Sequence, residues 1–339
     1  MKRYIFWNNK GGTGKTSLAF QATTIFAERN PSEKILVIDL CPQANLSEML
    51  LGGLMGSGST NLESLHNQNP RRSIAGYFQA RLPSPFTVPA FNPAEYIANA
   101  SVHNSNIPPN IDLVAGDALV ELQTNAISTL ANTQIPGTNT WLAVIDWLND
   151  FIRLVSSDYS YVFVDANPSF SIYTQIAIAA AELMILPVMA DDSSRRAVQN
   201  AFALVQGINL PSPLYQQHNF ATQIRAAGRN TPLFHLFVKN RLTQYMGPAS
   251  AYQSVLTSID GIISSVLATN PNVFSFRSLA DGIEEVRDFQ TTGVVAFALG
   301  SPFTRLRGGD HNLAGQRVQI RADYLQNCID ALNRVVNHL

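Results

Sequence analysis

Short unbroken runs of apolar residues recur along the chain. The two clearest are 35–39, which reads Ile-Leu-Val-Ile-Asp, and 161–165, which reads Tyr-Val-Phe-Val-Asp. Runs without polar alternation are typical of strands that are buried on both faces of a parallel sheet. We predict further strands at 2–7, 111–114, 183–188, 232–238 and 273–276.

Helical periodicity fills the intervals between these runs. Apolar residues recur three and four positions apart over 17–29, 74–81, 118–130, 141–155, 172–182 and 325–336. The order strand, helix, strand predicts right-handed βαβ units. We therefore expect an α/β fold in which helices cover both faces of a mostly parallel, twisted sheet, with ligands at the carboxyl ends of the strands.

The segment 52–110 interrupts this alternation. Its composition shifts to Gly, Ser, Asn and Pro, and we interpret it as a long surface excursion from a single domain that spans 1–339. Within it, Arg71-Arg72 is interpreted as a solvated turn. A later segment, 283–302, is interpreted as a closing helical region.

A glycine-rich turn, Asn9-Lys10-Gly11-Gly12-Thr13-Gly14-Lys15-Thr16, joins the first predicted strand to the first helix. Such a turn makes an anion site, because unpaired backbone N–H groups and the helix dipole converge on it. Glycines let phosphate oxygens approach the backbone closely. Lys15 adds a positive charge, and the Thr16 hydroxyl is suited to bind Mg²⁺. The turn predicts a phosphate-binding loop, although Asn9 stands where the strict Gly-x-x-x-x-Gly-Lys-Ser/Thr pattern has its first glycine.

Two aspartates follow predicted strands at the same edge of the sheet. Asp165 ends the run 161–165, which is the position of an aspartate that holds Mg²⁺, usually through water. Asp39 ends the run 35–39, and we expect it to interact with metal-bound water. The predicted metal site is therefore made of Thr16, Asp39 and Asp165.

With Lys10 ahead of the loop, the motif Lys-Gly-Gly-x-Gly-Lys-Thr resembles that of the ParA/MinD family of deviant Walker P-loop ATPases, most nearly its ParA-type partition proteins. The resemblance implies that ATP and Mg²⁺ bind at the loop, and that Lys10 reaches across a dimer interface, so that two protomers sandwich two ATP molecules. It also implies that Asn240 reads the adenine edge, the alternative being an ordinary turn role, and that Arg277 packs beside adenine. The implied nucleotide contacts are Lys10, Gly11, Gly12, Thr13, Gly14, Lys15, Thr16, Ser17, Asn240 and Arg277.

The chain departs from the family in two switch segments. Asp39-Leu40-Cys41-Pro42-Gln43 resembles Asp-x-Asp-Pro-Gln, whose second aspartate is associated with orienting the attacking water, and Cys41 stands at that position. A thiol with a pKa of about 8.5 is a poor acceptor at neutral pH, so we expect slow or differently assisted hydrolysis. Either Cys41 limits turnover, or Gln43, Asp39 or a partner protein orients the water. The second switch segment, Ala166-Asn167-Pro168-Ser169, resembles the family's Asp-x-Pro-Pro-Ser, and Asn167 replaces one of its prolines. The predicted catalytic residues are Lys10, Lys15, Asp39 and Cys41.

Composition and charge narrow the class of protein. Two cysteines cannot form a disulfide framework or hold an iron–sulfur cluster. The apolar run after Met1-Lys2-Arg3 is too short for a signal peptide, and we expect a cytosolic protein. The net charge is −1, but residues 197–339 carry 11 basic against 8 acidic side chains. The candidates for DNA contacts in this half are Arg225, Arg229, Arg241, Arg277 and Arg287.

Two predicted helices each have a structural interpretation and a more specific functional one. The terminal stripe, which ends at Val336, carries few positive charges, and acidic neighbours balance them. We therefore expect this helix to pack against the protein body and not to bind a membrane as the terminal helix of MinD does. Asp191 and Asp192 open another helix and are interpreted as caps, while Arg195 and Arg196 are candidates for a dimer face.

Two functional hypotheses follow from the residues and the resemblance. The first is a ParA-like ATPase that binds Mg²⁺–ATP, dimerises, binds DNA without reading its sequence and associates with the nucleoid. It would segregate DNA or position a cargo, with a ParB-like or adaptor partner stimulating slow hydrolysis. The alternative is a hydrolysis-impaired scaffold or regulatory module, which Cys41 would lock in its ATP-bound dimer.

Overall fold

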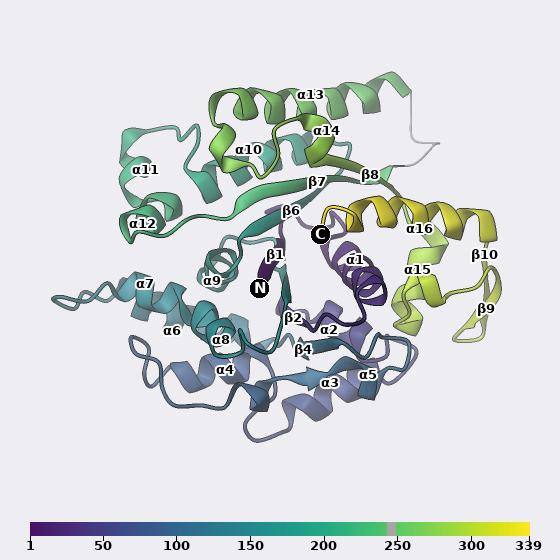
Figure 1. Ribbon diagram of the computed structural model, residues 1–339, viewed down its shortest axis with the longest axis horizontal. Helices are drawn as coiled ribbons and strands as arrows, with labels where there is room; N and C mark the ends of the chain where they lie inside the picture. The colour runs from purple at the N-terminus through teal and green to yellow at the C-terminus, as the bar shows by residue number, and fades with distance from the viewer. Residues whose placement is uncertain (243–248) are drawn as a thin grey trace.

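The computed structural model describes residues 1–242 and 249–339. Within them, eight strands form a central sheet with helices on both faces (Figure 1). In sheet order the strands are β3 (Ala98–Asn99), β4 (Ile111–Val114), β2 (Ile35–Leu40), β5 (Tyr161–Ala166), β1 (Lys2–Phe6), β6 (Leu183–Val188), β7 (Leu233–Leu242) and β8 (Ile283–Arg287). The pairs are parallel except β3–β4. The predicted α/β fold with a mostly parallel sheet is confirmed.

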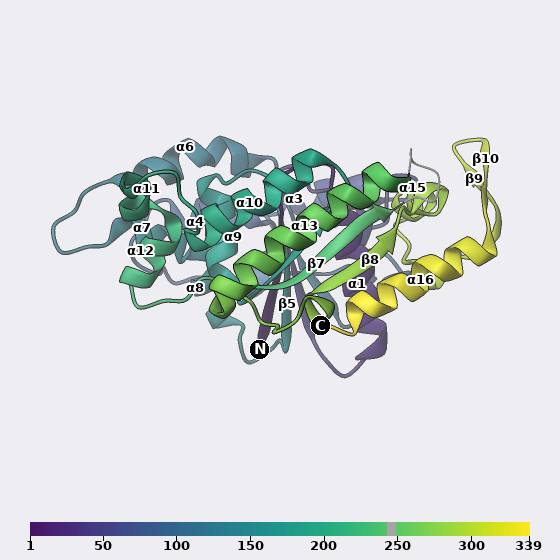
Figure 2. The same ribbon diagram turned by 90° about the horizontal axis from the view of Figure 1, so that it is seen from above.

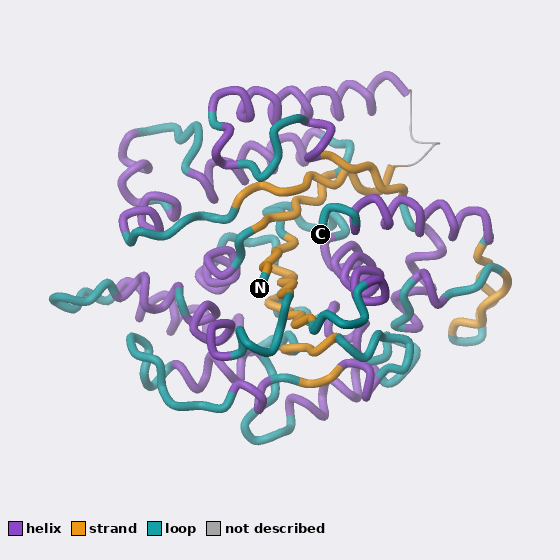
Figure 3. Tube along the Cα trace, viewed as in Figure 1, coloured by secondary structure: helices purple, strands orange, loops and turns teal. Residues whose placement is uncertain are grey.

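Each face of the sheet has its own hydrophobic core, because successive residues of a strand point to opposite faces. Tyr4 and Phe6 of β1 belong to one core, and Ile5 belongs to the other. The first core is closed by α1 (Lys15–Arg29), α2 (Asn45–Leu50), α5 (Ala100–His103), α15 (Gln290–Leu299) and α16 (Ala322–Val336). The second is closed by α4 (Ile74–Arg81), α6 (Leu119–Asn132), α7 (Thr140–Ile145), α8 (Trp147–Leu154), α9 (Ile172–Ala180), α10 (Asp192–Gln206), α12 (Phe220–Ala226) and α13 (Ala249–Thr269). Figure 3 shows the strands running between these two layers of helices.

The helix predicted over 141–155 is two helices, α7 and α8. Asp146 separates them with φ −83° and ψ 0°, a ψ far from the regular helical value of about −42°. Its carboxylate pairs with Arg229 and accepts a hydrogen bond from the Asn149 side chain at 3.1 Å. The apolar stripe is continuous across the break, which is why periodicity alone did not reveal it.

The strand predicted at 273–276 is wrong. The chain there forms the 3₁₀ turn η2 (Pro271–Val273) and one isolated bridge between Phe274 and Phe234. The strand that pairs with β7 is β8, inside the segment 283–302 that we interpreted as helical. Only Val286 of β8 is fully buried, as expected for an edge strand, and its short polar sequence resembles a helix end. The helical α14 (Leu279–Gly282) precedes β8, and α15 follows it.

The segment 52–110 is folded into the protein and is not simply a surface excursion. It contains α3 (Gly58–His66), α4, η1 (Pro93–Tyr96), β3 and α5. Ile74, Tyr77 and Phe78 of α4 are fully buried against the sheet. The interpretation of Arg71 as a solvated turn residue is also wrong, because its guanidinium pairs with the buried Asp117. We keep the name excursion for residues 52–110.

The C-terminal region adds a hairpin that the sequence did not predict. Strands β9 (Gly309–Leu313) and β10 (Gln316–Ile320) form a separate antiparallel pair, which projects from one end of the molecule in Figure 2. Two further short elements are α11 (Pro213–His218) and η3 (Phe303–Arg305).

The terminal helix α16 lies beside α1 and buries Leu325, Cys328 and Leu332 in the first core, so its predicted packing against the body is confirmed. No helix in the described ranges has the length and apolar character that a membrane span requires.

Candidate nucleotide site

The glycine-rich turn between β1 and α1 forms an open backbone cradle. Gly12 and Gly14 have φ values of 74° and 80°, which glycine adopts without strain. At Gly11 and Gly12 an added Cβ would meet no atom of the described residues within 4 Å, apart from its own residue and the two next to it in the chain. Helix α1 begins directly after Gly14, which provides no side-chain cap, so the first N–H groups of the helix remain available to an anion.

Asn240 of β7 lies against this turn. Its amide nitrogen donates to the Thr13 carbonyl oxygen at 2.9 Å, and its side-chain oxygen accepts the Arg241 N–H at 2.9 Å. A side chain at Gly14 would overlap the Asn240 amide nitrogen, so position 14 accommodates only glycine. The structure thus brings Asn240 to the loop, although its expected contact with an adenine edge stays a prediction.

Arg241 also lies beside the loop, although the sequence placed it in the DNA set. It has a positive φ of 58° at an irregularity of the β7–β8 pairing between Lys239 and Leu242. Such irregularities redirect a side chain, and the Arg241 Nε lies 3.9 Å from where a Gly14 Cβ would stand. An exposed guanidinium is therefore available at the rim of the cradle.

The predicted metal-binding side chains converge below the turn. Strands β2 and β5 are adjacent, and Asp39 is directly in register with Asp165. The Thr16 hydroxyl donates to Asp165 Oδ2 at 2.8 Å. Among residues 1–242 and 249–339, no group hydrogen-bonds to the buried Oδ1 of Asp165. An unpaired carboxylate oxygen beside a second carboxylate and a hydroxyl fits a hard divalent cation such as Mg²⁺.

Burial and mutual repulsion disfavour two charged carboxylates at this place. Burial, followed by the Asp39 charge, raises the pKa of Asp165 to about 7. Burial raises the pKa of Asp39 to about 6, although hydrogen bonds from Ser47 and from the Cys41 N–H oppose the shift. A cation between them would relieve this repulsion, so the cost of burying the two aspartates is consistent with a metal site.

Cys41 follows Asp39 and is almost fully buried, with 8% of its surface exposed. Burial, followed by the charges of Asp39 and Asp165, raises the pKa of its thiol to about 12. The thiol therefore stays protonated at neutral pH and provides no negative charge for a water molecule.

The two lysines of the loop point to different partners. The Lys15 ammonium donates to the Lys10 carbonyl oxygen at 3.0 Å, and burial lowers its pKa while the Asp165 charge opposes that shift. The Lys10 ammonium leaves the cradle, pairs with Asp191 and donates to the Ser194 hydroxyl at 3.1 Å. Ser17, the remaining predicted contact, is half-buried in the first turn of α1.

Comparison with known proteins agrees with this geometry. The family model described as an AAA domain (AAA_31), which is of the ParA/MinD type, matches residues 1–212. The chain belongs to this family. The cell division protein PomZ of Myxococcus xanthus is 26% identical over 209 residues, which are 61% of this chain and 52% of PomZ, so the match spans about half of the relative's length.

Solved structures with the same fold cover nearly the whole chain. The ATP complex of a Cyanothece McdA variant matches 99% of this chain and 96% of its own, with 15% identity and a TM-score of 0.62. The structure of pNOB8 ParA bound to nonspecific DNA matches 99% and 98%, with 14% identity and a TM-score of 0.55. At these identities the likeness establishes the fold.

In this ParA/MinD-type chain the five candidate DNA arginines do not gather on one surface. Arg241 and Arg287 lie at the carboxyl ends of β7 and β8, and Arg241 is beside the loop. Arg225 and Arg229 lie in and after α12, near the amino ends of the strands, where Arg225 donates to Gln206 and Arg229 pairs with Asp146.

Arg277 also lies near the amino ends of the strands and donates to the Pro271 carbonyl oxygen at 3.3 Å. The structure therefore does not bring Arg277 beside Asn240, where contact with adenine was expected.

Sequence reasoning missed several residues that support the ParA/MinD-type loop. Asn8 is fully buried, donates to the Pro187 carbonyl oxygen at 2.8 Å and accepts the Lys10 N–H at 3.0 Å. Trp7 donates its indole N–H to the Ser169 carbonyl oxygen, in the second switch segment, at 3.3 Å. The polar Asn8 directly after a buried strand was the available signal, since such a residue needs internal hydrogen-bond partners.

Proposed function

We propose that this chain is a ParA-like ATPase that binds Mg²⁺–ATP, forms a nucleotide-dependent dimer and binds DNA without reading its sequence. Its role would be to segregate DNA or to position a cargo. The observation that carries the proposal is the open glycine cradle next to Thr16, whose hydroxyl contacts Asp165. The Oδ1 of Asp165 has no hydrogen-bond partner within the part of the chain that the structure describes. Members of the family are ATPases.

In this proposal each residue of the site has its own role in binding the nucleotide or the metal. Backbone N–H groups of the loop and the Lys15 ammonium hold the phosphates, while Thr16 and Asp165 hold Mg²⁺, with Asp39 acting through metal-bound water. Bound Mg²⁺ neutralises charge on phosphate oxygens. Lys10 must leave Asp191 and Ser194 before it reaches a partner's nucleotide, so dimerisation requires this contact to break.

Binding to DNA is tested with a random-sequence duplex and purified protein in the apo, ADP and ATP states. We expect binding only with ATP, and an affinity that falls steeply as salt rises, because phosphate contacts release counterions. The pNOB8 ParA structure with nonspecific DNA supports this expectation. If the ATP-bound protein shows no binding to the duplex at low salt, the proposed DNA role is refuted.

A second function is favoured by the state of Cys41. Its protonated, buried thiol is a poor group for orienting water, which suits an ATP-dependent scaffold or regulatory module with impaired hydrolysis. A ParB-like or adaptor partner that completes the site would restore the first function.

Phosphate release by Cys41→Asp separates the two functions, with Cys41→Ser as the neutral control of similar size. If the thiol limits turnover, Cys41→Asp raises the rate at least about tenfold and Cys41→Ser leaves it low. A wild-type rate that already equals that of Cys41→Asp, with or without DNA, would show that another group orients the water.

A further inference from the structure

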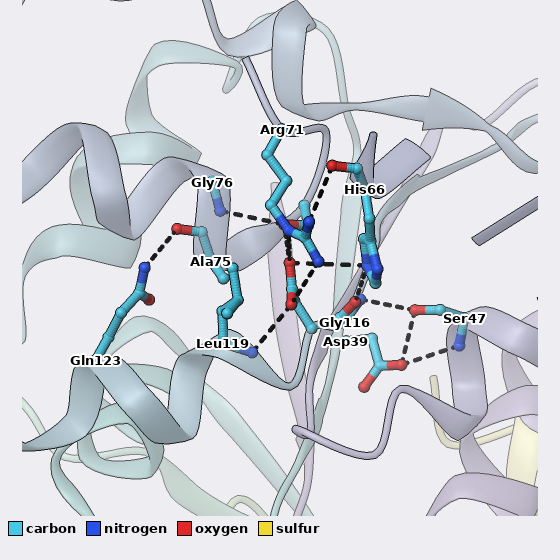
Figure 4. Close-up of polar contacts among 11 residues, drawn as sticks. Asp39, Ser47, His66, Arg71, Ala75, Gly76, Gly116, Leu119 and Gln123 are labelled. Carbon is cyan, nitrogen blue, oxygen red and sulfur yellow. Dashed lines mark hydrogen bonds and ion pairs between the residues drawn. The ribbon is translucent and has the colours of Figure 1, made fainter. Parts of the chain in front are cut away.

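A chain of hydrogen bonds joins Asp39 to the excursion (Figure 4). It begins at Ser47 of α2, which is fully buried. The Ser47 N–H and hydroxyl both donate to Asp39 Oδ2, at 2.9 and 2.7 Å. Because the single hydroxyl proton is used in this way, the Ser47 oxygen accepts from the Gly116 N–H, at 2.8 Å. The serine therefore has one orientation, fixed from both sides.

Gly116 lies directly against the same carboxylate. A Cβ at this position would stand 2.8 Å from Asp39 Cγ and Oδ2, and 3.0 Å from the Cα of Ala44. Only glycine fits there without displacing the switch segment. Gly116 is therefore connected to Asp39 in two ways, by direct contact and through Ser47.

The excursion holds Gly116 and its neighbour Asp117 from the other side. His66 Nε2 lies 2.9 Å from the Gly116 carbonyl oxygen, and since a carbonyl only accepts, this nitrogen carries the proton. Arg71 makes two hydrogen bonds to Asp117 and a third, at 3.0 Å, to the His66 carbonyl oxygen. The Ser73 hydroxyl donates to Asp117 at 2.6 Å. Asp117 is 1% exposed, so these contacts form a buried clamp.

We propose that Ser47 is a positioning residue for Asp39, and that the excursion sets this position through its clamp on Gly116 and Asp117. The inference rests on the proposed function, because it concerns the carboxylate assigned to metal-bound water. Ser47 holds Oδ2, while Oδ1 accepts one hydrogen bond from the described residues, from the Cys41 N–H at 3.1 Å. The excursion is then part of the switch, and a partner that binds it has a physical route to the nucleotide site.

A purely structural role for these contacts predicts a different pattern of effects. Loss of folding stability would weaken every property of the site together, including binding of nucleotide without metal. Loss of positioning would spare metal-free binding, which depends on the loop, and would affect the Mg²⁺-dependent steps.

The first test compares Ser47→Ala with Ser47→Thr, which keeps the hydroxyl. Binding of a fluorescent ATP analogue is measured in EDTA and during a Mg²⁺ titration, and phosphate release is followed separately. We expect Ser47→Ala to bind the analogue in EDTA as the wild type does, and to lose roughly 10- to 100-fold in Mg²⁺ affinity or turnover. Ser47→Thr should recover most of that loss. Wild-type binding of the analogue together with an unchanged Ser47→Ala overturns the inference alone, while a wild type that binds no analogue overturns the proposed function as well.

The second test acts at the far end of the clamp. Arg71→Met removes the hydrogen bonds to Asp117. Its matched control is Arg72→Met, since the Arg72 side chain donates to the Glu95 carbonyl oxygen at 3.2 Å and makes no hydrogen bond to Asp117 in the described ranges. We expect turnover to fall roughly 2- to 30-fold in Arg71→Met and to stay unchanged in Arg72→Met. Equal rates in the two variants would contradict the proposal.

Hydrogen exchange in the wild type tests the same link without a variant, and so it still applies if Arg71→Met fails to fold. Adding Mg²⁺ and the ATP analogue should change protection of residues 66–73 and 115–119, although they lie outside the phosphate loop. Unchanged protection there, with protection gained at the loop, would refute the link between the excursion and the site.

Discussion

Cys41 lies in the segment that resembles the family's Asp-x-Asp-Pro-Gln motif, and its surroundings keep the thiol neutral. Asp39 and Asp165 lie close enough that their charges raise the thiol pKa further, in addition to the effect of burial. A carboxylate at this position would make a third acid in the same pocket. The neutral thiol therefore does not repel Asp39 and Asp165 in the nucleotide-free protein. It also provides no charged acceptor for a hydrogen bond from water.

Thiol reactivity tests this description of Cys41. Because burial and neighbouring charges raise the pKa to about 12, the thiolate population stays negligible between pH 7 and 9. Alkylation of native Cys328→Ala, which leaves Cys41 as its single cysteine, should stay slow across this range, while the urea-unfolded protein should react faster as pH approaches about 8.5. The rates are followed by mass spectrometry, and native reactivity that rises with pH as in the unfolded chain would contradict the account.

At the level of single residues, the sequence predicted side chains whose type and spacing carry chemistry. The structure brings Thr16 and Asp165 together as hydrogen-bonded partners, and their binding of a metal ion stays a prediction. Ser47 and Asn8 were not predicted, because their roles depend on which backbone groups face them in the fold. The prediction that Arg277 lies near adenine assumed a strand at 273–276. The chain forms a 3₁₀ turn at Pro271–Val273, so that prediction lost its basis.

Helix α10 shows how one element connects the loop to the rest of the protein. Asp191 caps its first turn, accepting the Ser194 N–H at 2.7 Å, so the predicted capping role is confirmed. Burial opposes ionisation of Asp191, but hydrogen bonds from Lys10 and from the Ser194 N–H outweigh it and lower the pKa to about 2. The cap thus stays charged and holds Lys10 at physiological pH.

Substitutions of Asp191 separate the cap from the charge. Asp191→Ala loses both and should lower the free energy of unfolding by about 0.5–2 kcal/mol, whereas Asp191→Asn keeps a side-chain cap and should lose less. Urea denaturation at neutral pH measures both. Equal losses in the two variants would show that the cap contributes nothing to stability.

The same contact gives a pH dependence of known sign. Since the folded pKa of Asp191 is lowered, its contribution to stability is present above the unfolded value of about 4 and is lost as pH falls toward 2.

The sequence predicted the bounds of a strand well where the strand is buried on both faces of the sheet. The runs ending at Asp39 and Asp165 became β2 and β5 within one residue. The edge strand β8 and the break at Asp146 were missed, because edge strands bury little and a single irregular residue leaves helical periodicity intact. The β9–β10 hairpin has mostly exposed polar positions and gave no apolar pattern.

Over the whole molecule, the loop, the carboxylates and the switch segments meet at the carboxyl edge of the sheet. The excursion reaches this edge through Gly116 and Asp117, and α10 reaches it through Lys10. Some of the candidate DNA arginines lie at the carboxyl ends of the strands and others near the amino ends, so one protomer does not present them as a single surface. The proposed DNA-binding surface would therefore need arginines from two copies, and it depends on the proposed dimer.

Molar mass in solution, measured by light scattering on a sizing column, shows whether ATP brings two copies of the chain together. Wild type and Lys10→Ala are each measured in the apo, ADP and ATP states with Mg²⁺. We predict a protomer mass of 37.1 kDa for both proteins without ATP, a doubling for the wild type with ATP, and no doubling for Lys10→Ala. A wild type that keeps the protomer mass at saturating ATP would rule out the ATP-dependent dimer, and a Lys10→Ala variant that dimerises as readily would rule out the role of Lys10.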